Sequence, residues 1–162
     1  MITARTAGLT IALAFLTAAP ALADATVFLG GNVTPSTRIA KGVALGVSFA
    51  ALGLEAEYCD TDDAPASNAP ALRTGMANAL LQTPIPLPLL GLQPYVTAGG
   101  GVYRETLGLH EDTNFGWNIG GGVKLTLIGP LRLRVDYRRF SLGSGALNSP
   151  AHRVYVGLNL GF

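Results

Sequence analysis

The chain has 162 residues, of which 49% are hydrophobic and only 13% are charged. That charged share is about half the average for soluble domains, and the length predicts a single domain. The only cysteine, Cys59, excludes an intrachain disulfide and a cysteine-based metal site. Without Arg5, which belongs to the leader described next, ten basic and ten acidic residues remain. The mature chain therefore has no basic footprint for nucleic acid.

Residues 1–23 have the three parts of a secretory signal peptide. Arg5 supplies the positive charge, Leu9–Leu16 form a short apolar run, and Ala21-Leu22-Ala23 form an A-x-A cleavage pattern. The apolar run is too short for a membrane-spanning helix, so we predict cleavage after Ala23 and one mature domain over 24–162. No later stretch reaches the roughly 18 apolar residues of such a helix. A mature chain that enters a membrane must therefore do so as a barrel.

The mature chain contains eight segments in which apolar residues alternate with small or polar residues. A β-strand sends successive side chains to opposite faces, so each segment has one apolar face. The predicted strands cover 25–33, 41–50, 52–60, 72–83, 93–105, 114–127, 131–142 and 152–162. The segment 72–83 alternates poorly, and its register and facing stay open.

Two kinds of connection separate these strands. The longer ones, expected at 34–40, 61–71, 106–113 and 143–151, alternate with turns near Ala51, at Pro84–Gly91 and at Ile128–Pro130. Strands of about ten residues, tilted by about 40°, rise roughly 25 Å, the height of the apolar band of an outer-membrane barrel. We predict an all-β fold, a closed eight-stranded antiparallel up-and-down transmembrane β-barrel. Its longer loops would face outwards, and both termini would be periplasmic.

The last eleven residues show the alternation most clearly. One face of this strand is wholly apolar, and it consists of Val154, Val156, Leu158, Leu160 and Phe162. The other face is small or polar, with Tyr155, Gly157, Asn159 and Gly161. This pattern predicts a strand whose polar face points into a narrow interior and whose apolar face points at lipid.

Three internal segments strengthen this interpretation through a resemblance to a known family. They are QPYVTAGGGV at 93–102, FGWNIGGGV at 115–123 and RVDYRRF at 134–140. Together with the last strand they resemble the small eight-stranded outer-membrane β-barrels, the family of the outer membrane protein A barrel and its X-type relatives. The resemblance implies a monomeric integral protein of the outer membrane of a Gram-negative-type bacterium. It also implies that the outer-membrane assembly machinery reads the C-terminal strand, through Tyr155, Leu158, Leu160 and Phe162.

Seven charged residues fall on the face of their strands that avoids lipid. They are Glu55, Glu57, Lys124, Arg132, Arg134, Asp136 and Arg138. The interior of an eight-stranded barrel is just wide enough for side chains, and charges there must pair or be hydrated. We predict that the two glutamates pair with arginines and form a structural plug. A narrow, porin-like ion path through the same charges is the alternative.

Basic residues at the outer ends of strands fall on the lipid side. They are Lys41, Arg73, Arg104 and Arg139, with His152 beside them. The outer leaflet of such a membrane carries lipid phosphates, which lysine and arginine bind well. The sequence therefore suggests a rim that contacts lipopolysaccharide, while simple snorkelling of basic side chains at the interface is the alternative.

Candidate catalytic residues are sparse. Some barrels of this size deacylate lipid A, which requires a histidine and a serine backed by a carboxylate. Here Ser149 precedes His152, and Asp112 could join them only through loop folding; His110-Glu111-Asp112 is expected to be a solvated cluster. We expect no catalytic site, metal or cofactor, and a structural, envelope-integrity or surface-interaction role. A lipid A-modifying enzyme and a soluble periplasmic barrel are less favoured alternatives.

Overall fold

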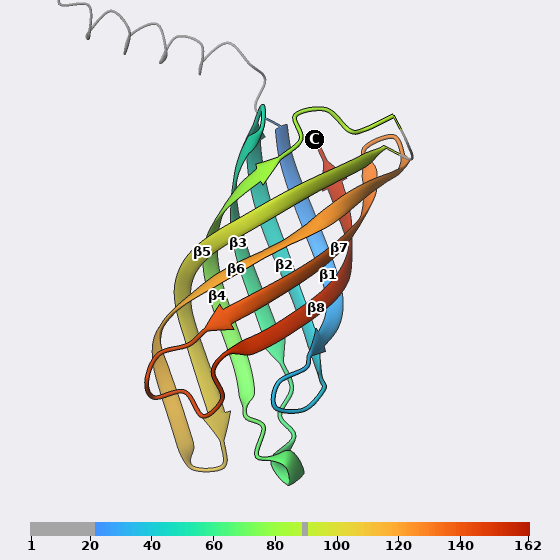
Figure 1. Ribbon diagram of the computed structural model, residues 1–162. Helices are drawn as coiled ribbons and strands as arrows, with labels where there is room; N and C mark the ends of the chain where they lie inside the picture. Colours follow the sequence, from blue (N-terminus) through green and yellow to red (C-terminus); the bar gives the residue numbers. More distant parts are fainter. Residues whose placement is uncertain (1–21, 89–90) are drawn as a thin grey trace, which may run out of the picture.

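The computed structural model describes residues 22–88 and 91–162, which form one closed antiparallel barrel (Figure 1). Its strands are β1 (Leu22–Asn32), β2 (Arg38–Phe49), β3 (Leu52–Thr61), β4 (Ala71–Gln82), β5 (Leu92–Leu107), β6 (His110–Ile128), β7 (Leu131–Ser141) and β8 (Ala151–Gly161). They pair in sequence order, so the predicted fold class is confirmed. A 3-10 turn, Pro65–Ser67, lies between β3 and β4. No helix in the described ranges is long and apolar enough to cross a membrane.

The predicted leader lies almost entirely outside the described residues, which begin with β1 at Leu22. Ala23 is already paired with the last residue of the chain, since its N–H donates to the Phe162 carbonyl over 3.0 Å. In return the Phe162 N–H donates to the Ala23 carbonyl over 2.8 Å. β1 thus begins two residues before the predicted mature N-terminus.

Closure of the barrel depends on the pairing of the first strand with the last. β1 and β8 are antiparallel partners from Asp24↔Gly161 to Asn32↔Arg153, and they lie side by side in Figure 1. A sheet closed in this way has no free edge, so no strand leaves backbone N–H or C=O groups unpaired in a medium without water. This pairing makes a membrane-spanning sheet possible.

The two faces of the wall have inverted polarity compared with a water-soluble barrel. In β2, Leu45 is 64% exposed on the outside, whereas the neighbouring Ala44 is 1% exposed on the inside. The outer face carries leucine, valine and aromatic side chains, and the inner face carries most of the buried charged and amide groups. A soluble barrel would need the reverse arrangement, so the structure contradicts that alternative.

The structure also determines the facing of β4, which the sequence left open. Leu72, Met76 and Leu80 point inwards with polar residues between them, while Arg73 and the small Ala77 point outwards. The alternation is poor in the sequence because β4 has apolar residues on its inner face and very small ones on its outer face.

The connections cluster at two ends of the barrel. The start of β1, the C-terminus and the β2–β3, β4–β5 and β6–β7 connections lie at one end, called here the end with the termini, and the other four connections lie at the opposite end (Figure 1). The predicted outer loop at 106–113 is wrong, because β5 and β6 continue as a paired hairpin to a tight turn at Gly108, whose φ is +58°. The first outer connection is also shorter than predicted, because β2 already begins at Arg38.

A pair of glycines tests how tightly the wall is packed. A Cβ at the inward-facing Gly101 would lie 2.0 Å from the Gly75 carbonyl oxygen, whereas a Cβ at Gly75 would meet nothing within 4 Å. We expect Gly101→Ala to lower the free energy of unfolding by about 1–3 kcal/mol through overpacking, and Gly75→Ala to leave it almost unchanged. Urea unfolding in lipid vesicles would measure both, and equal midpoints for the two variants would contradict the packing described here.

Candidate functional site

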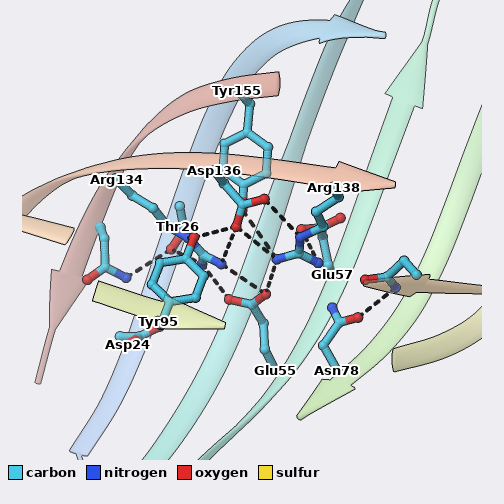
Figure 2. A network of polar contacts seen from close by, with 12 residues as sticks. Asp24, Thr26, Glu55, Glu57, Asn78, Tyr95, Arg134, Asp136, Arg138 and Tyr155 are labelled. Atoms are coloured by element: carbon cyan, nitrogen blue, oxygen red, sulfur yellow. Dashed lines mark hydrogen bonds and ion pairs between the residues drawn. The ribbon is translucent and has the colours of Figure 1, made fainter. Parts of the chain in front are cut away.

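A charge-balanced network of ion pairs lies inside the barrel at mid-height, near the middle of β3 and β7, and Figure 2 shows it from close by. It joins three carboxylates to three guanidinium groups, all buried: Glu55, Glu57, Asp136, Arg134, Arg138 and Arg153. Arg138 is its centre, with Nη2 2.8 Å from Glu55, Nη1 3.1 Å from Glu57 and Nε 3.0 Å from Asp136. Arg134 pairs with Glu55 and Asp136, and Arg153 pairs with Glu57.

Two tyrosines, Tyr95 and Tyr155, pack against this network. Tyr95 donates its hydroxyl hydrogen to Asp136 and accepts a hydrogen bond from Arg134 Nε over 2.7 Å. The Arg134 guanidinium lies 4.8 Å from the centre of the Tyr95 ring, a cation–π distance. Tyr155 stacks on Phe28 with ring centres 4.1 Å apart. Aromatic rings thus pack against the charges and fill the space between them.

The structure divides the seven predicted lumen charges into three groups. Five of them meet in the network described above, as Figure 2 shows. Lys124 instead forms a separate buried pair with Asp24, at 2.8 Å and nearer the end with the termini. Arg132 is only partly buried and donates to the Gln93 side chain over 3.1 Å.

Sequence reasoning missed two members of these pairs. Arg153 stands two residues before Tyr155 and so shares its inward face, which could have been found by extending the alternation of the last strand. Asp24 lies beside the predicted cleavage site and was not assigned to the lumen. Both are needed for charge balance, because Arg153 pairs with Glu57 and Asp24 pairs with Lys124.

Between the network and the longer loops, apolar side chains form a cluster in the interior. The buried cluster there consists of Leu72, Met76, Tyr103, Phe140, Leu142 and Ala151. Ala146, from the connection between β7 and β8, packs against it. The barrel interior therefore has its ion pairs at mid-height, and beneath the outer loops it has an apolar cluster beside buried polar groups such as Thr74 and Asn118.

Buried polar groups tie the outer loops to one another. Glu105 accepts a hydrogen bond over 2.8 Å from the backbone N–H of Leu147, in the β7–β8 connection. Arg38 donates to the carbonyl of Pro70 and, over 2.6 Å, to that of Thr34. These contacts join the β1–β2, β3–β4 and β7–β8 connections to the strands at the loop end of the barrel. Neither Glu105 nor Arg38 was predicted in the lumen, because both lie at or beyond the ends assigned to their strands.

The end of the barrel at which β1 begins and β8 ends has a cavity of mixed character. A cavity of about 430 Å³ lies there, with Gln82, Gln93 and Arg132 among its lining residues. The buried pair of Lys124 and Asp24 lies on the inner side of this mouth. The barrel is thus hollow at one mouth and filled at the other.

Three of the four predicted rim residues form exposed ion pairs. Lys41 lies 3.5 Å from Asp62, Arg73 3.2 Å from Asp60, and Arg104 2.6 Å from Glu111. All four residues point away from the lumen, on the lipid side.

Arg139 is the exception within the rim. It has no carboxylate within 4 Å among the described residues, and its cross-strand partner is His152. The Nδ1 atom of His152 lies 2.7 Å from the hydroxyl of Tyr137, on the same outer face.

The residues considered for catalysis do not come together. Ser149 Oγ accepts a hydrogen bond from the Leu142 N–H over 3.1 Å, and His152 contacts Tyr137. Asp112 accepts a hydrogen bond from Tyr103 over 2.7 Å. Within residues 22–88 and 91–162, no group of three or more His, Cys, Asp and Glu side chains could hold a metal ion.

The four residues proposed as the assembly signal lie on different faces of the last strand. Tyr155 is buried in the lumen, and Leu158 and Leu160 are exposed on the outer face. Phe162, just beyond β8, is also exposed. A protein that approaches from the lipid side would therefore meet the two leucines and the terminal aromatic, but not the Tyr155 side chain.

A closed eight-stranded wall with an apolar exterior and a charged interior defines a class, the transmembrane β-barrels of the bacterial outer membrane. No family model matches the chain. No curated protein matches it either.

Solved structures share the fold. The chain is 18% identical to Neisserial surface protein A (NspA), with a TM-score of 0.62, over 88% of this chain and 96% of that one. It is 17% identical to the N-terminal β-barrel domain of Pseudomonas aeruginosa OprF, with a TM-score of 0.63, over 87% and 97%. The outer membrane enzyme PagL is 15% identical, with a TM-score of 0.54, over 85% and 98%. The fold is thus that of the small eight-stranded outer-membrane barrels.

The neighbouring residues Arg138 and Arg139 offer a matched test of the network. Arg138→Met would leave three buried carboxylates with two guanidinium groups, so we expect the free energy of unfolding to fall by roughly 3–5 kcal/mol. Arg139→Met changes the same side chain on the exposed face and is expected to cost no more than about 0.5 kcal/mol. Urea titration in vesicles measures both, and similar losses would show that the network does not stabilise the barrel.

Proposed function

We propose that this protein is a non-enzymatic, plugged outer-membrane barrel that supports the envelope and presents its outer loops at the cell surface. The observation that carries the proposal is what fills the lumen along the barrel axis. A balanced ion-pair network fills the middle of the lumen, and an apolar cluster lies between it and the outer mouth.

The alternative of a narrow ion channel is disfavoured by both the network and the apolar cluster. An ion that crossed the middle would have to separate Arg138 from the three carboxylates that surround it, at distances of 2.8–3.1 Å. It would then have to pass the buried cluster that contains Met76 and Phe140, whose apolar side chains cannot replace its hydration shell. The cavity at the other end lies on the inner side of the network, next to the pair of Lys124 and Asp24.

Two further features support a role at the surface. The outer connections are held to the barrel by buried contacts of Arg38 and Glu105, so they present a defined shape. The apolar outer face of β8 ends with Leu158, Leu160 and Phe162, which suits recognition of this strand by the outer-membrane assembly machinery. We propose that the barrel functions as a monomer that contacts membrane lipid and lipopolysaccharide.

Electrical recording tests the plug directly. In planar lipid bilayers we expect the refolded barrel to give no discrete conductance steps, because paired charges and the cluster of Met76 and Phe140 occupy the lumen. An open porin inserted under the same conditions is the positive control. Reproducible steps from the folded protein that disappear after boiling would overturn the proposal in favour of the channel.

The absence of enzymatic activity is tested with lipid A as substrate. We expect the mass spectrum of lipid A to stay unchanged after incubation with the barrel, because Ser149 bonds to Leu142 rather than to His152. His152→Ala is the matched variant. Loss of an acyl chain with the unaltered protein, but not with this variant, would assign a hydrolase function instead.

A further inference from the structure

The outer wall formed by β2–β5 contains a hollow that the proposed function does not explain. From the positions described below, we propose that this wall binds one phosphorylated, acylated glycolipid of the outer leaflet. Its phosphate would lie between Arg73 and Arg104, and an acyl chain would lie in the hollow beneath them. The inference rests on the proposed contact between the rim and lipopolysaccharide, and it assigns that contact to one site.

The head of this site is a pair of like charges. Arg73 and Arg104 are direct cross-strand partners on the outer face of β4 and β5. Such partners have Cα atoms only about 4.5–5.5 Å apart, and like charges in this arrangement repel each other. Each arginine pairs with a carboxylate on the strand that flanks β4 and β5. Asp60 on β3 contacts Arg73, and Glu111 on β6 contacts Arg104. The order of charge around the wall is therefore minus, plus, plus, minus.

Both guanidinium groups remain available to an anion. Their side chains are 61% and 49% exposed. Among the described residues, Arg73 bonds Asp60 through Nε, and Arg104 contacts Glu111 through Nη2, which leaves other N–H groups on each. Exposed ion pairs of this kind contribute little stability. A phosphate between the two arginines would receive charge-assisted hydrogen bonds from both.

The tail of the site is an apolar hollow below the arginines. It has a volume of about 620 Å³, and alanines from three neighbouring strands line it, with leucines on the side of β2 and β3: Ala56, Ala77, Ala79, Ala98, Leu45 and Leu54. Gly75 lies between Arg73 and Ala77 on the outer face of β4, and the space in front of it is empty to 4 Å. Gly75 thus leaves an open position on β4 between the rim and the hollow, flanked by Tyr58 and Val102 on the neighbouring strands.

The length of the site from the rim through the hollow fits one leaflet. From Arg73 to Ala79 the strand rises about 20 Å along its axis. With the tilt of about 40° usual for these barrels, that is roughly 15 Å of depth in an apolar band about 25 Å tall. The site therefore begins among the headgroups and ends near the middle of the membrane, as an acyl chain does.

Charge favours a lipid over a second copy of the chain. A second barrel at the same depth would bring its own basic rim against Arg73 and Arg104, and this would add repulsion. A glycolipid instead supplies a negative group at the head and an apolar chain in the hollow. Because the two arginines lie at the end with the longer loops, the lipid belongs to the outer leaflet.

Native mass spectrometry of the refolded barrel in detergent, titrated with purified lipid A, tests the site. We expect one retained lipid A molecule. The double variant Arg73→Gln with Arg104→Gln should bind it at least about tenfold more weakly, because charge-assisted bonds are lost. Gly75→Leu should also weaken binding by placing a side chain between the rim and the hollow, and an added Cβ there meets nothing within 4 Å.

Matched controls lie on the opposite wall. Arg139→Gln removes a rim charge on β7, and Val156→Leu adds bulk on the outer face of β8. Both should leave binding unchanged, and heat-dependent gel mobility should show that every variant is folded. Equal binding of lipid A by all variants would overturn the proposal. The proposed function as a plugged barrel would be unaffected by that result if the barrel remained non-conducting.

Other probes identify which chemical groups of the ligand the site recognises. Lipid A without phosphates should bind more weakly, and inorganic phosphate alone should not displace lipid A. Displacement by inorganic phosphate would reduce the site to a bare anion site, and equal binding of phosphatidylglycerol would show a general affinity for anionic lipid. A dimer that Gly75→Leu abolishes would assign the hollow to a second copy. Each of these three results would overturn the proposal.

Discussion

The absence of water from the hydrocarbon core of a membrane is the constraint on which the structure depends. Every backbone polar group must find a partner within the sheet, and only closure achieves this. β1 pairs with β8 along nearly its whole length, so the barrel has no free edge. Closure with only eight strands then leaves an interior that side chains alone can fill.

The narrow interior explains the ion-pair network. Unpaired charges in such a space would be costly, and three carboxylates meet three guanidinium groups there. Arg138 contacts all three carboxylates, so the arrangement stabilises the barrel only as a complete set. The same packing closes the lumen, which links the stability of the fold to the proposed lack of conductance.

The outer wall is subject to the opposite requirement, since it must be apolar to face lipid. Within that requirement its shape is free to vary, and here one side is hollowed by alanines below Arg73 and Arg104. Bulky residues such as Val156 and Leu158 cover the opposite side. The proposed glycolipid site depends on this asymmetry of the wall.

The sequence by itself determined the strand count, the closed fold and the inward face of most strands, because alternation at every second residue follows directly from strand geometry. It also placed Glu55 and Arg138 inside. Only the tertiary structure decided the pairing partners, since these depend on register between strands far apart in sequence, by 96 residues for Glu57 and Arg153 and by 100 for Asp24 and Lys124. The extension of the β5–β6 hairpin through 106–113 was likewise set by cross-strand pairing, which polar composition alone conceals. The hollow beneath Arg73 was beyond sequence reasoning for the same reason, because it forms only where small residues of neighbouring strands meet.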